Sequence, residues 1–378
     1  MFKPRFNFAT CAGACNHGIF LMPPDFTATS IGHSYLPSIG NAEIDRQISE
    51  LLEKSGVDSN TLLIQELIVT ALKIGRENYS VADLKLFNRA LKEMRSAAKM
   101  FTPYTGRKKV VVFGSARTAA TEPAAIAAEE FTAKMREHGY MTITGGGDGI
   151  MGAAQKGAGR DFGFGLNIKL PFEQRANETI LGDRKLVNFN YFFTRKLNFV
   201  KETHAITLFP GGFGTMDEGF EVLTLMQTGK SRIIPYVLVD TPGSTFWQTW
   251  LDFLKDQLLK NGLVSENDFH LFKLTNSVDA AVQEILQFYK NFRSYRWVGK
   301  KMVIRLEKAL TKDAQQDLNT RFADLLQVGT IEQGSALPEE MNEPEIAPLP
   351  RLILTPQQRD YGKIRLFLDA INRAPVVE

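Results

Sequence analysis

Between about Lys109 and Tyr295 the chain alternates short apolar runs with longer segments in which apolar residues recur every three or four positions. The short runs predict buried β-strands, and the longer segments predict amphipathic helices that cover a sheet. The predicted strands are "KVVVFGS", "MTITGGG", "GFGLNIKLP", "HAITLFP" and "IIPYVLVD". Because strands that alternate with helices form right-handed βαβ units, we expect an α/β fold with a Rossmann-like, doubly wound parallel sheet.

The pattern changes on both sides of this region. The N-terminal part contains helical segments, and the last of them begins after Ser80, a predicted N-cap, with Asp83 at the third helical position. The C-terminal part combines two predicted strands with two helices and a Pro- and Glu-rich loop at 335–350, which we expect to be mobile or to wrap around a neighbour. We therefore expect a helical N-terminal extension at 1–104, a Rossmann-like core at 105–297 and a small α+β C-terminal extension at 298–378.

Composition and charge narrow the class of protein. The chain has 378 residues, of which 44% are hydrophobic and 23% charged, as is typical of globular proteins. Its 45 basic and 42 acidic side chains nearly balance and form no basic run, so we expect no binding to nucleic acid or to membrane surfaces. No apolar stretch approaches the ~20 residues that span a bilayer. Because Asn16 and His17 interrupt the N-terminal apolar residues, we expect no signal peptide and a cytoplasmic location.

The two cysteines, Cys11 and Cys15, lie close together near the N-terminus and are followed by His17. A structural or catalytic metal site would need a third ligand and usually a fourth. No further ligand is found nearby in the sequence, so we expect two reduced cysteines and no metal site.

Three turns that contain glycine follow predicted strands: "FGSAR" (113–117), "GGGDGIMG" (145–152) and "PGGFGT" (210–215). In an open parallel sheet, ligands bind beyond the carboxyl ends of the strands, where these turns are expected. Glycine lets backbone N–H groups approach a ligand closely, and the start of the next helix adds partial positive charge. One such turn is common in any fold, but three on one edge favour a bound nucleotide or phosphate.

Two generic nucleotide motifs fit the sequence poorly. The glycines of 147–152 have the G-x-G-x-x-G spacing, and Glu173 follows at the distance expected of a dinucleotide fingerprint. This turn follows the second predicted strand rather than the first, however, and no second nucleotide-binding half is evident. The segment "TLMQTGKS" ends like a P-loop, but Thr224 stands where the first glycine is required and the segment closes a helix, so Gly229 fits a helix C-cap better.

A more specific resemblance is to the LONELY GUY (LOG) family. The segment "PGGFGTMDE" (210–218) resembles the family's P-G-G-x-G-T-x-x-E signature, and "FFTRK" (192–196) resembles its Arg-Lys pair. The segments "GGGDGIMGAA" and "LPFE" resemble its second glycine turn and its Pro-x-Glu element. LOG proteins are phosphoribohydrolases that cleave nucleoside 5′-monophosphates into a free base and ribose 5-phosphate. The resemblance therefore implies a hydrolase that cleaves an N-glycosidic bond without a cofactor, and a homodimer or a multiple of dimers.

The sequence departs from plant-type members of the family at Phe192 and Phe193, which replace a Met-His pair. In this respect it is similar to the larger bacterial pyrimidine/purine nucleotide 5′-monophosphate nucleosidases, which also carry terminal extensions. We therefore expect ordinary purine or pyrimidine monophosphates rather than cytokinin nucleotides as substrates. Many relatives are called lysine decarboxylases, but the Ser-x-His-Lys setting of a pyridoxal phosphate lysine is missing, since no histidine precedes a lysine.

Asp217 and Glu218 directly follow a turn that is expected to hold a negatively charged phosphate. Carboxylates at this place would repel the phosphate. This conflict is resolved if Glu218, one helical turn after Thr215, faces the sugar instead of the phosphate. Cleavage of an N-glycosidic bond develops positive charge on the ribose ring, which a fixed carboxylate stabilises. Arg195 would balance the negative charge of the phosphate or of the departing base. We therefore predict Arg195 and Glu218 as catalytic residues, and Asp217 as a helix cap.

The predicted substrate-binding residues come from the glycine turns and from the family resemblance. They are Gly114, Ser115, Gly146, Gly147, Glu173, Lys196, Gly211, Gly212, Gly214, Thr215, Glu221 and Thr224. Among them, the N–H groups of the last three glycines and the Thr215 hydroxyl are expected to hold the 5′-phosphate. The alternative hypothesis is a non-catalytic nucleotide-binding or sensing protein of the same fold.

Overall fold

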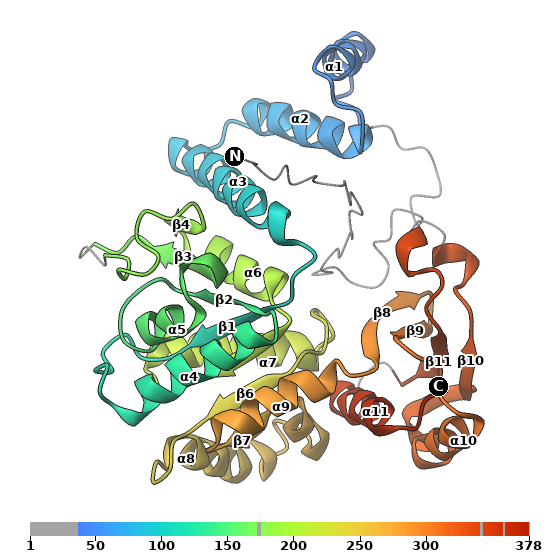
Figure 1. Cartoon of the computed structure of the whole chain (residues 1–378). Helices are drawn as coiled ribbons and strands as arrows, with labels where there is room; N and C mark the ends of the chain where they lie inside the picture. Colours follow the sequence, from blue (N-terminus) through green and yellow to red (C-terminus); the bar gives the residue numbers. More distant parts are fainter. Residues whose placement is uncertain (1–36, 172–174, 341–342, 358–359, 378) are drawn as a thin grey trace, which may run out of the picture. The chain divides into compact units, whose positions relative to one another are not determined.

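The computed structural model describes residues 37–171, 175–340, 343–357 and 360–377 (Figure 1). The helices are α1 Ala42–Lys54, α2 Thr61–Arg76, α3 Val81–Phe101, α4 Pro123–Glu137, α5 Ile150–Ala158, α6 Phe192–Glu202, α7 Phe213–Gln227, α8 Phe246–Phe253, α9 Val278–Phe288, α10 Lys312–Arg321 and α11 Tyr361–Arg373. The strands are β1 Lys109–Phe113, β2 Met141–Thr144, β3 Gly163–Ile168, β4 Leu186–Phe189, β5 Ala205–Leu208, β6 Tyr236–Val239, β7 Lys273–Thr275, β8 Phe292–Val298, β9 Lys301–Leu306, β10 Leu326–Gly334 and β11 Arg351–Pro356. Among the described helices, none combines the length and the apolar character needed to cross a bilayer.

Seven parallel strands form the main sheet, in the order β4-β3-β2-β1-β5-β6-β7. The chain starts in the middle with β1 and winds first to one side and then, from β5, to the other, so the strand order reverses between β1 and β5. In the central register, Val111 lies opposite Ile143 on β2 and Ile206 on β5. The predicted α/β, Rossmann-like, doubly wound fold is confirmed. The edge strands β4 and β7 were not predicted.

Helices cover both faces of this sheet because successive strand residues point to opposite sides. Val110 and Val112 of β1 pack with buried residues of α4, α5 and α9 on one face. Val111 and Phe113 pack with buried residues of α6 and α7 on the other face (Figure 1). All five residues of β1 are buried, and a fully buried valine contributes about 1.5–3 kcal/mol relative to an exposed one. This double burial explains why most residues of the central strands are apolar.

Residues 37–96 and the chain from Ala97 onward form two separate compact units. In the first unit, α1 and α2 pack through Ile48, Leu52 and Val69. The predicted start of α3 is confirmed: the backbone N–H of Asp83 donates to Ser80 Oγ at 3.1 Å, and this hydroxyl donates to the Asp83 carboxylate at 2.7 Å.

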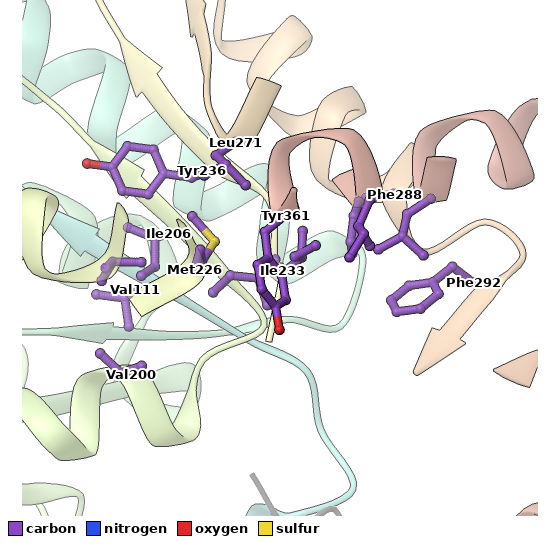
Figure 2. Packing of buried hydrophobic residues seen from close by; sticks show 14 of the residues in the cluster. Val111, Val200, Ile206, Met226, Ile233, Tyr236, Leu271, Phe288, Phe292 and Tyr361 are labelled. Atoms are coloured by element: carbon purple, nitrogen blue, oxygen red, sulfur yellow. The ribbon is translucent and has the colours of Figure 1, made fainter. Parts of the chain in front are cut away.

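The C-terminal part forms a four-stranded antiparallel sheet in the order β10-β11-β9-β8. It belongs to the same compact unit as the parallel sheet, and one hydrophobic cluster runs through both. Figure 2 shows Phe288 and Phe292 of this cluster near Ile233 and Tyr361. Asn372 of α11 fixes the junction, since its side-chain oxygen accepts hydrogen bonds from two successive backbone N–H groups, each at 2.8 Å, where β8 begins.

The acidic loop at 335–350 differs from the expectation of a mobile or neighbour-wrapping segment. Glu340 is only 1% exposed and accepts hydrogen bonds from Arg305 Nε at 2.9 Å and from Arg351 Nε at 3.1 Å. Both arginines lie on strands of the chain's own antiparallel sheet. The described part of the loop is therefore anchored by buried ion pairs, which the sequence pattern did not reveal because they depend on how β9 and β11 pack against the loop.

Candidate active site

The three glycine turns meet at the carboxyl edge of the parallel sheet, as predicted. The backbone N–H of Ser115, after β1, donates to Pro210 O, after β5, at 3.1 Å. The carbonyl oxygen of Ser115 accepts from the N–H of Ile150, at the start of α5, at 3.0 Å. The turn after β1 is therefore hydrogen-bonded to both other turns, directly at the point where the strand order reverses.

Two of the glycines are required by close packing between these turns. A Cβ atom at Gly211 would lie 2.2 Å from Thr215 Oγ1 and 2.9 Å from the backbone N of Ser115. At Gly149, whose φ is +63°, a Cβ would lie 2.4 Å from the Ser115 carbonyl oxygen. A side chain at either position would push the turns apart.

Gly212 and Gly214 have a different environment. A Cβ atom at either position would meet nothing within 4 Å, so both face open space. Helix α7 begins at Phe213, and its N-cap Gly212 has no side chain that could cap the first N–H groups. The first backbone donors of a helix have no partner within the helix. This end of α7 therefore combines open space, free donors and partial positive charge, which suits an anion.

The second glycine turn is held by Asn177, which sequence reasoning did not identify. The side-chain amide of Asn177 donates to the carbonyl oxygens of Gly146 and Gly147, both at 3.0 Å. The N–H of Gly146, whose φ is +77°, donates to Thr144 Oγ1 at 3.0 Å. The turn is therefore a fixed wall of the site. The predicted substrate residue Glu173 lies outside the described residues.

Charged side chains of α6 and α7 meet behind the PGGFGT turn. Arg195 Nη2 lies 3.3 Å from Glu218 Oε1, and Lys196 Nζ lies 3.4 Å from Glu218 Oε2. Lys196 also lies 2.9 Å from a carboxylate oxygen of Asp217 and 2.9 Å from one of Glu221. The structure thus brings together four predicted site residues, the cations Arg195 and Lys196 and the carboxylates Glu218 and Glu221. Glu218 lies at the centre of this group and is 5% exposed.

Burial shifts the protonation equilibria of this group. Burial raises the pKa of Glu218, and the nearby charges of Lys196 and Arg195 offset only part of the rise. Burial also lowers the pKa of Arg195, against the influence of Glu218. Burial alone would lower the pKa of Lys196, but its hydrogen bonds to Asp217 and Glu221 outweigh burial and raise it. Lys196 is therefore a firmly protonated ammonium group.

Arg195 is held between aromatic rings. Its guanidinium carbon lies 4.9 Å from the ring centre of Phe192 and 5.5 Å from that of Phe199. Its Nε is buried and has no hydrogen-bond partner among the residues that the structure describes. Phe193 stacks on Tyr191 at 5.6 Å and is about half exposed. The start of α6 therefore presents an oriented guanidinium with a spare donor, beside exposed aromatic surface.

The prediction that Asp217 caps a helix is wrong. Because α7 already begins at Phe213, Asp217 is the fifth helical residue, and its exposed side chain pairs with Lys196 instead. The predicted site residue Thr215 is buried one helical turn before Glu218. Thr224, also a predicted site residue, is exposed and lies about 120° around the helix from Glu218 at ~100° per residue.

The structure shows no group of three or more metal-ligating side chains in the described part of the chain. Cys11, Cys15 and His17 lie outside that part. The three carboxylates around Lys196 form ion pairs with two cations of the protein itself, Arg195 and Lys196.

Comparisons with known proteins match the part of the chain that carries the PGGFGT turn and helices α6 and α7. A family model described as "Possible lysine decarboxylase" matches residues 149–285. A curated protein from Oryza sativa subsp. japonica, the probable cytokinin riboside 5′-monophosphate phosphoribohydrolase LOGL5, is 30% identical over 163 residues, which are 42% of this chain and 63% of the relative. The match therefore spans less than two thirds of the length of that relative.

Solved structures show partial similarity. The X-ray structure of TM1055, a structural genomics target, is 23% identical with a TM-score of 0.35, over 48% of this chain and 99% of that chain. The molybdenum cofactor carrier protein from Chlamydomonas reinhardtii is 21% identical with a TM-score of 0.33, over 48% of this chain and 98% of that chain.

Proposed function

We propose that the core of this chain belongs to the LOG family, and that the protein hydrolyses the N-glycosidic bond of nucleoside 5′-monophosphates to give a free base and ribose 5-phosphate. The name of the rice relative, a probable phosphoribohydrolase of a nucleoside 5′-monophosphate, supports a hydrolase of this kind. The observation that carries the proposal is the buried Glu218 carboxylate, which Arg195 and Lys196 fix directly behind an open, glycine-lined helix N-terminus.

The 5′-phosphate would bind at the start of α7. Gly212 and Gly214 leave open space there, the first N–H groups of the helix are available, and the helix end favours negative charge. Thr215 adds a hydroxyl at the same turn. Glu218 follows three residues later, about 4.5 Å along the helix at ~1.5 Å per residue, so the phosphate and the sugar would meet opposite charges on successive turns.

In the proposed reaction, a water oxygen bonds to C1′ of the ribose while the bond from C1′ to the base nitrogen breaks. The base leaves with the electron pair of that bond and takes up a proton, and the attacking water loses one, so protons and charge balance. Positive charge develops on the sugar, and the ionised carboxylate of Glu218 stabilises it, more strongly in a buried site than in water. Arg195, with an unpartnered Nε donor, would bind the phosphate or the departing base.

The residues at this site do not fit the pyridoxal phosphate chemistry that the description "Possible lysine decarboxylase" implies. A lysine that forms a Schiff base must reach its neutral amine form, usually through a lowered pKa. Lys196 contacts the carboxylates of Asp217, Glu218 and Glu221, and its pKa is raised. We therefore propose that Lys196 holds the carboxylates in place, and that the reaction needs neither cofactor nor metal.

The proposed substrates are ordinary purine or pyrimidine monophosphates. Phe192 and Phe193, which replace the Met-His pair of plant-type members, are half exposed at the start of α6 and give the base an aromatic wall. The alternative, a nucleotide-binding protein without turnover, would use the same turns. The pairing of Glu218 with Arg195 favours the enzyme, because a carboxylate beside a phosphate site weakens simple anion binding.

The direct test is incubation of the full chain with AMP, GMP, CMP, UMP and IMP, followed by chromatography for the free base. We expect base and ribose 5-phosphate in equal amounts, with no change after a chelator is added. The same preparation of the Glu218→Gln variant controls for contaminating nucleosidases. Calorimetric binding of these nucleotides without base release would support the alternative and contradict the enzyme.

A further inference from the structure

Two cavities lie at the amino end of the parallel sheet, opposite to the candidate active site. The inner cavity encloses about 100 Å³ and is lined by the segments that precede β1, β5 and β6 together with the start of β8. The outer cavity, of about 400 Å³, shares Gly106, Arg107, Lys108 and Tyr289 with the inner one. Lys108 directly precedes β1, so the five residues of this strand, roughly 16 Å at ~3.3 Å per residue, separate these cavities from the glycine turns.

The lining of the inner cavity is strongly basic. Arg107 and Lys108 come from the segment before β1, Arg232 from the segment before β6, and Arg293 from β8. Among the described residues that line either cavity, none is acidic. Arg293 contacts the carboxylate of the half-exposed Glu307 at 3.4 Å, and Arg232 donates a hydrogen bond to the neutral carbonyl oxygen of Thr203 at 3.0 Å. The cavity therefore gathers more positive charge than its own residues neutralise.

The positive charges repel one another across the cavity. Burial lowers the pKa of Lys108, and the positive charge of Arg293 lowers it further, while Glu307 offsets part of the effect. Arg293 lies on the C-terminal sheet and Lys108 on the parallel-sheet core, so the two walls bring like charges together. An anion between them would relieve the repulsion and the cost of burying unpaired charge.

Hydrogen bonds hold the walls in fixed positions. Lys109 Nζ donates to Tyr104 O at 2.9 Å and to Arg107 O at 3.2 Å, which fixes the segment before β1. The hydroxyl of Tyr289 donates to His204 O at 2.6 Å. The N–H of Ile233 donates to the hydroxyl of Tyr295 on β8 at 3.2 Å. A site with fixed walls loses little freedom when a ligand binds.

We propose that these cavities bind a small phosphorylated anion, with a phosphate group in the inner cavity between Lys108, Arg232 and Arg293. The inner volume equals about three times the ~30 Å³ that one water occupies in the liquid, which is enough for a phosphate group. Guanidinium and ammonium groups are the side chains that bind phosphate most strongly. The rest of the ligand would extend into the outer cavity, past His138 and Tyr140. This proposal does not depend on the proposed catalytic function.

Inorganic phosphate and pyrophosphate are the probes for the test, because they lack a base and a sugar. Binding to the full chain is measured by calorimetry, and the sites are located by hydrogen–deuterium exchange. We expect protection at 104–108 and 292–295, and at least tenfold weaker binding at this site in both Lys108→Gln and Arg293→Gln. Lys290→Gln is the matched control, because this exposed lysine follows Tyr289 but lines neither cavity.

The catalytic turns are expected to bind phosphate as well, so a Gly214→Asp variant separates the two sites. It places a carboxylate at the start of α7 and should remove protection there while protection at 104–108 and 292–295 persists. Protection confined to 210–216 would overturn the proposal. Unchanged affinity and protection in both cavity variants would overturn it equally.

Discussion

The guanidinium of Arg195 and the carboxylate of Glu218 lie 3.3 Å apart in the space between α6 and α7, and their side chains are only 13% and 6% exposed. A carboxylate in such a place has two properties at once. Its two cationic neighbours keep it fixed, and its burial raises its pKa above the usual value of 4.5. Both properties bear on the reaction, because only the ionised form can stabilise a cationic sugar.

The pH dependence of turnover should report the raised pKa of Glu218. As the pH falls through this pKa, the carboxylate is protonated and loses its charge, so kcat should fall at a pH above 4.5. Lys196→Gln removes a charge that lowers the pKa of Glu218, so the acid limb should move to higher pH. The measurement is kcat from pH 4 to 9 for the unmodified protein, for Lys196→Gln and for Asp217→Asn, which removes a negative charge that raises the pKa of Glu218 and should therefore move the acid limb the opposite way, to lower pH. If the acid limb lies at the same pH in the Lys196→Gln variant, the limb does not report the pKa of Glu218.

Two glycines of the same turn should respond differently to alanine. Gly211→Ala places a methyl group 2.2 Å from Thr215 Oγ1, so overpacking should lower the free energy of unfolding by about 1–3 kcal/mol. Gly214→Ala meets nothing within 4 Å and lies in α7, so the fold should keep its stability while AMP binds more weakly. Chemical denaturation and calorimetry give the two quantities. Equal loss of stability in both variants would show that the open space at Gly214 is filled.

Glu340 should stabilise the C-terminal sheet, since it pairs with Arg305 and Arg351. Glu340→Gln leaves the buried Arg351 without a carboxylate and leaves Arg305 with Glu343 alone, and should cost about 3–5 kcal/mol of unfolding free energy. Burial alone would raise the pKa of Glu340, but the N–H of Leu337 and the charge of Arg305 lower it overall.

The pH dependence of stability follows from that lowered pKa. The contribution of Glu340 is fully present above the unfolded value of 4.5 and is lost as the pH falls through the lower folded pKa. Urea denaturation at pH 7 and at pH 3 tests this, with the neighbouring exposed Glu339→Gln as control. A Glu340→Gln variant as stable as the control at pH 7 would contradict the role of the buried pair.

The central part of the fold could be predicted from the sequence because β1, β2, β3, β5 and β6 are buried on both faces and therefore consist mostly of apolar residues. The strands β4 and β7 lie at the sheet edges, pair on one side only and keep exposed polar residues, so no apolar run marked them. Strand β10 is mostly exposed and was missed for the same reason.

The candidate site was predictable where it depends on local sequence. Parallel strands place their carboxyl ends on one edge, so the convergence of the three turns followed from the strand assignment. The ion pairs of the site could not be predicted from the sequence, because the contacts of Lys196 with Asp217 and Glu221 depend on how α6 packs beside α7. Asn177 was missed because its two bonds to the second glycine turn span about 30 residues of sequence.

The assembly is proposed to be a homodimer or a multiple of dimers, as the family resemblance implies. Phe213 is 95% exposed at the start of α7, and Phe192 and Phe193 are half exposed at the start of α6; exposed aromatic residues of this kind are typical of protein interfaces. We expect light scattering at micromolar concentration to give at least twice the chain mass of 42.3 kDa. A stable monomer under these conditions would refute the proposal.

The central claim, that the Glu218 carboxylate stabilises charge that develops on the sugar, is tested most directly by kcat for AMP in the Glu218→Gln variant. Glutamine keeps the size and the hydrogen-bonding capacity of the side chain but removes its charge, so AMP affinity should stay within a few-fold. The loss should fall on kcat, by about 10²–10³ or about 3–4 kcal/mol. Asp217→Asn, which changes an exposed partner of Lys196, should keep near-normal turnover. Near-normal adenine release by a folded Glu218→Gln variant would contradict the account.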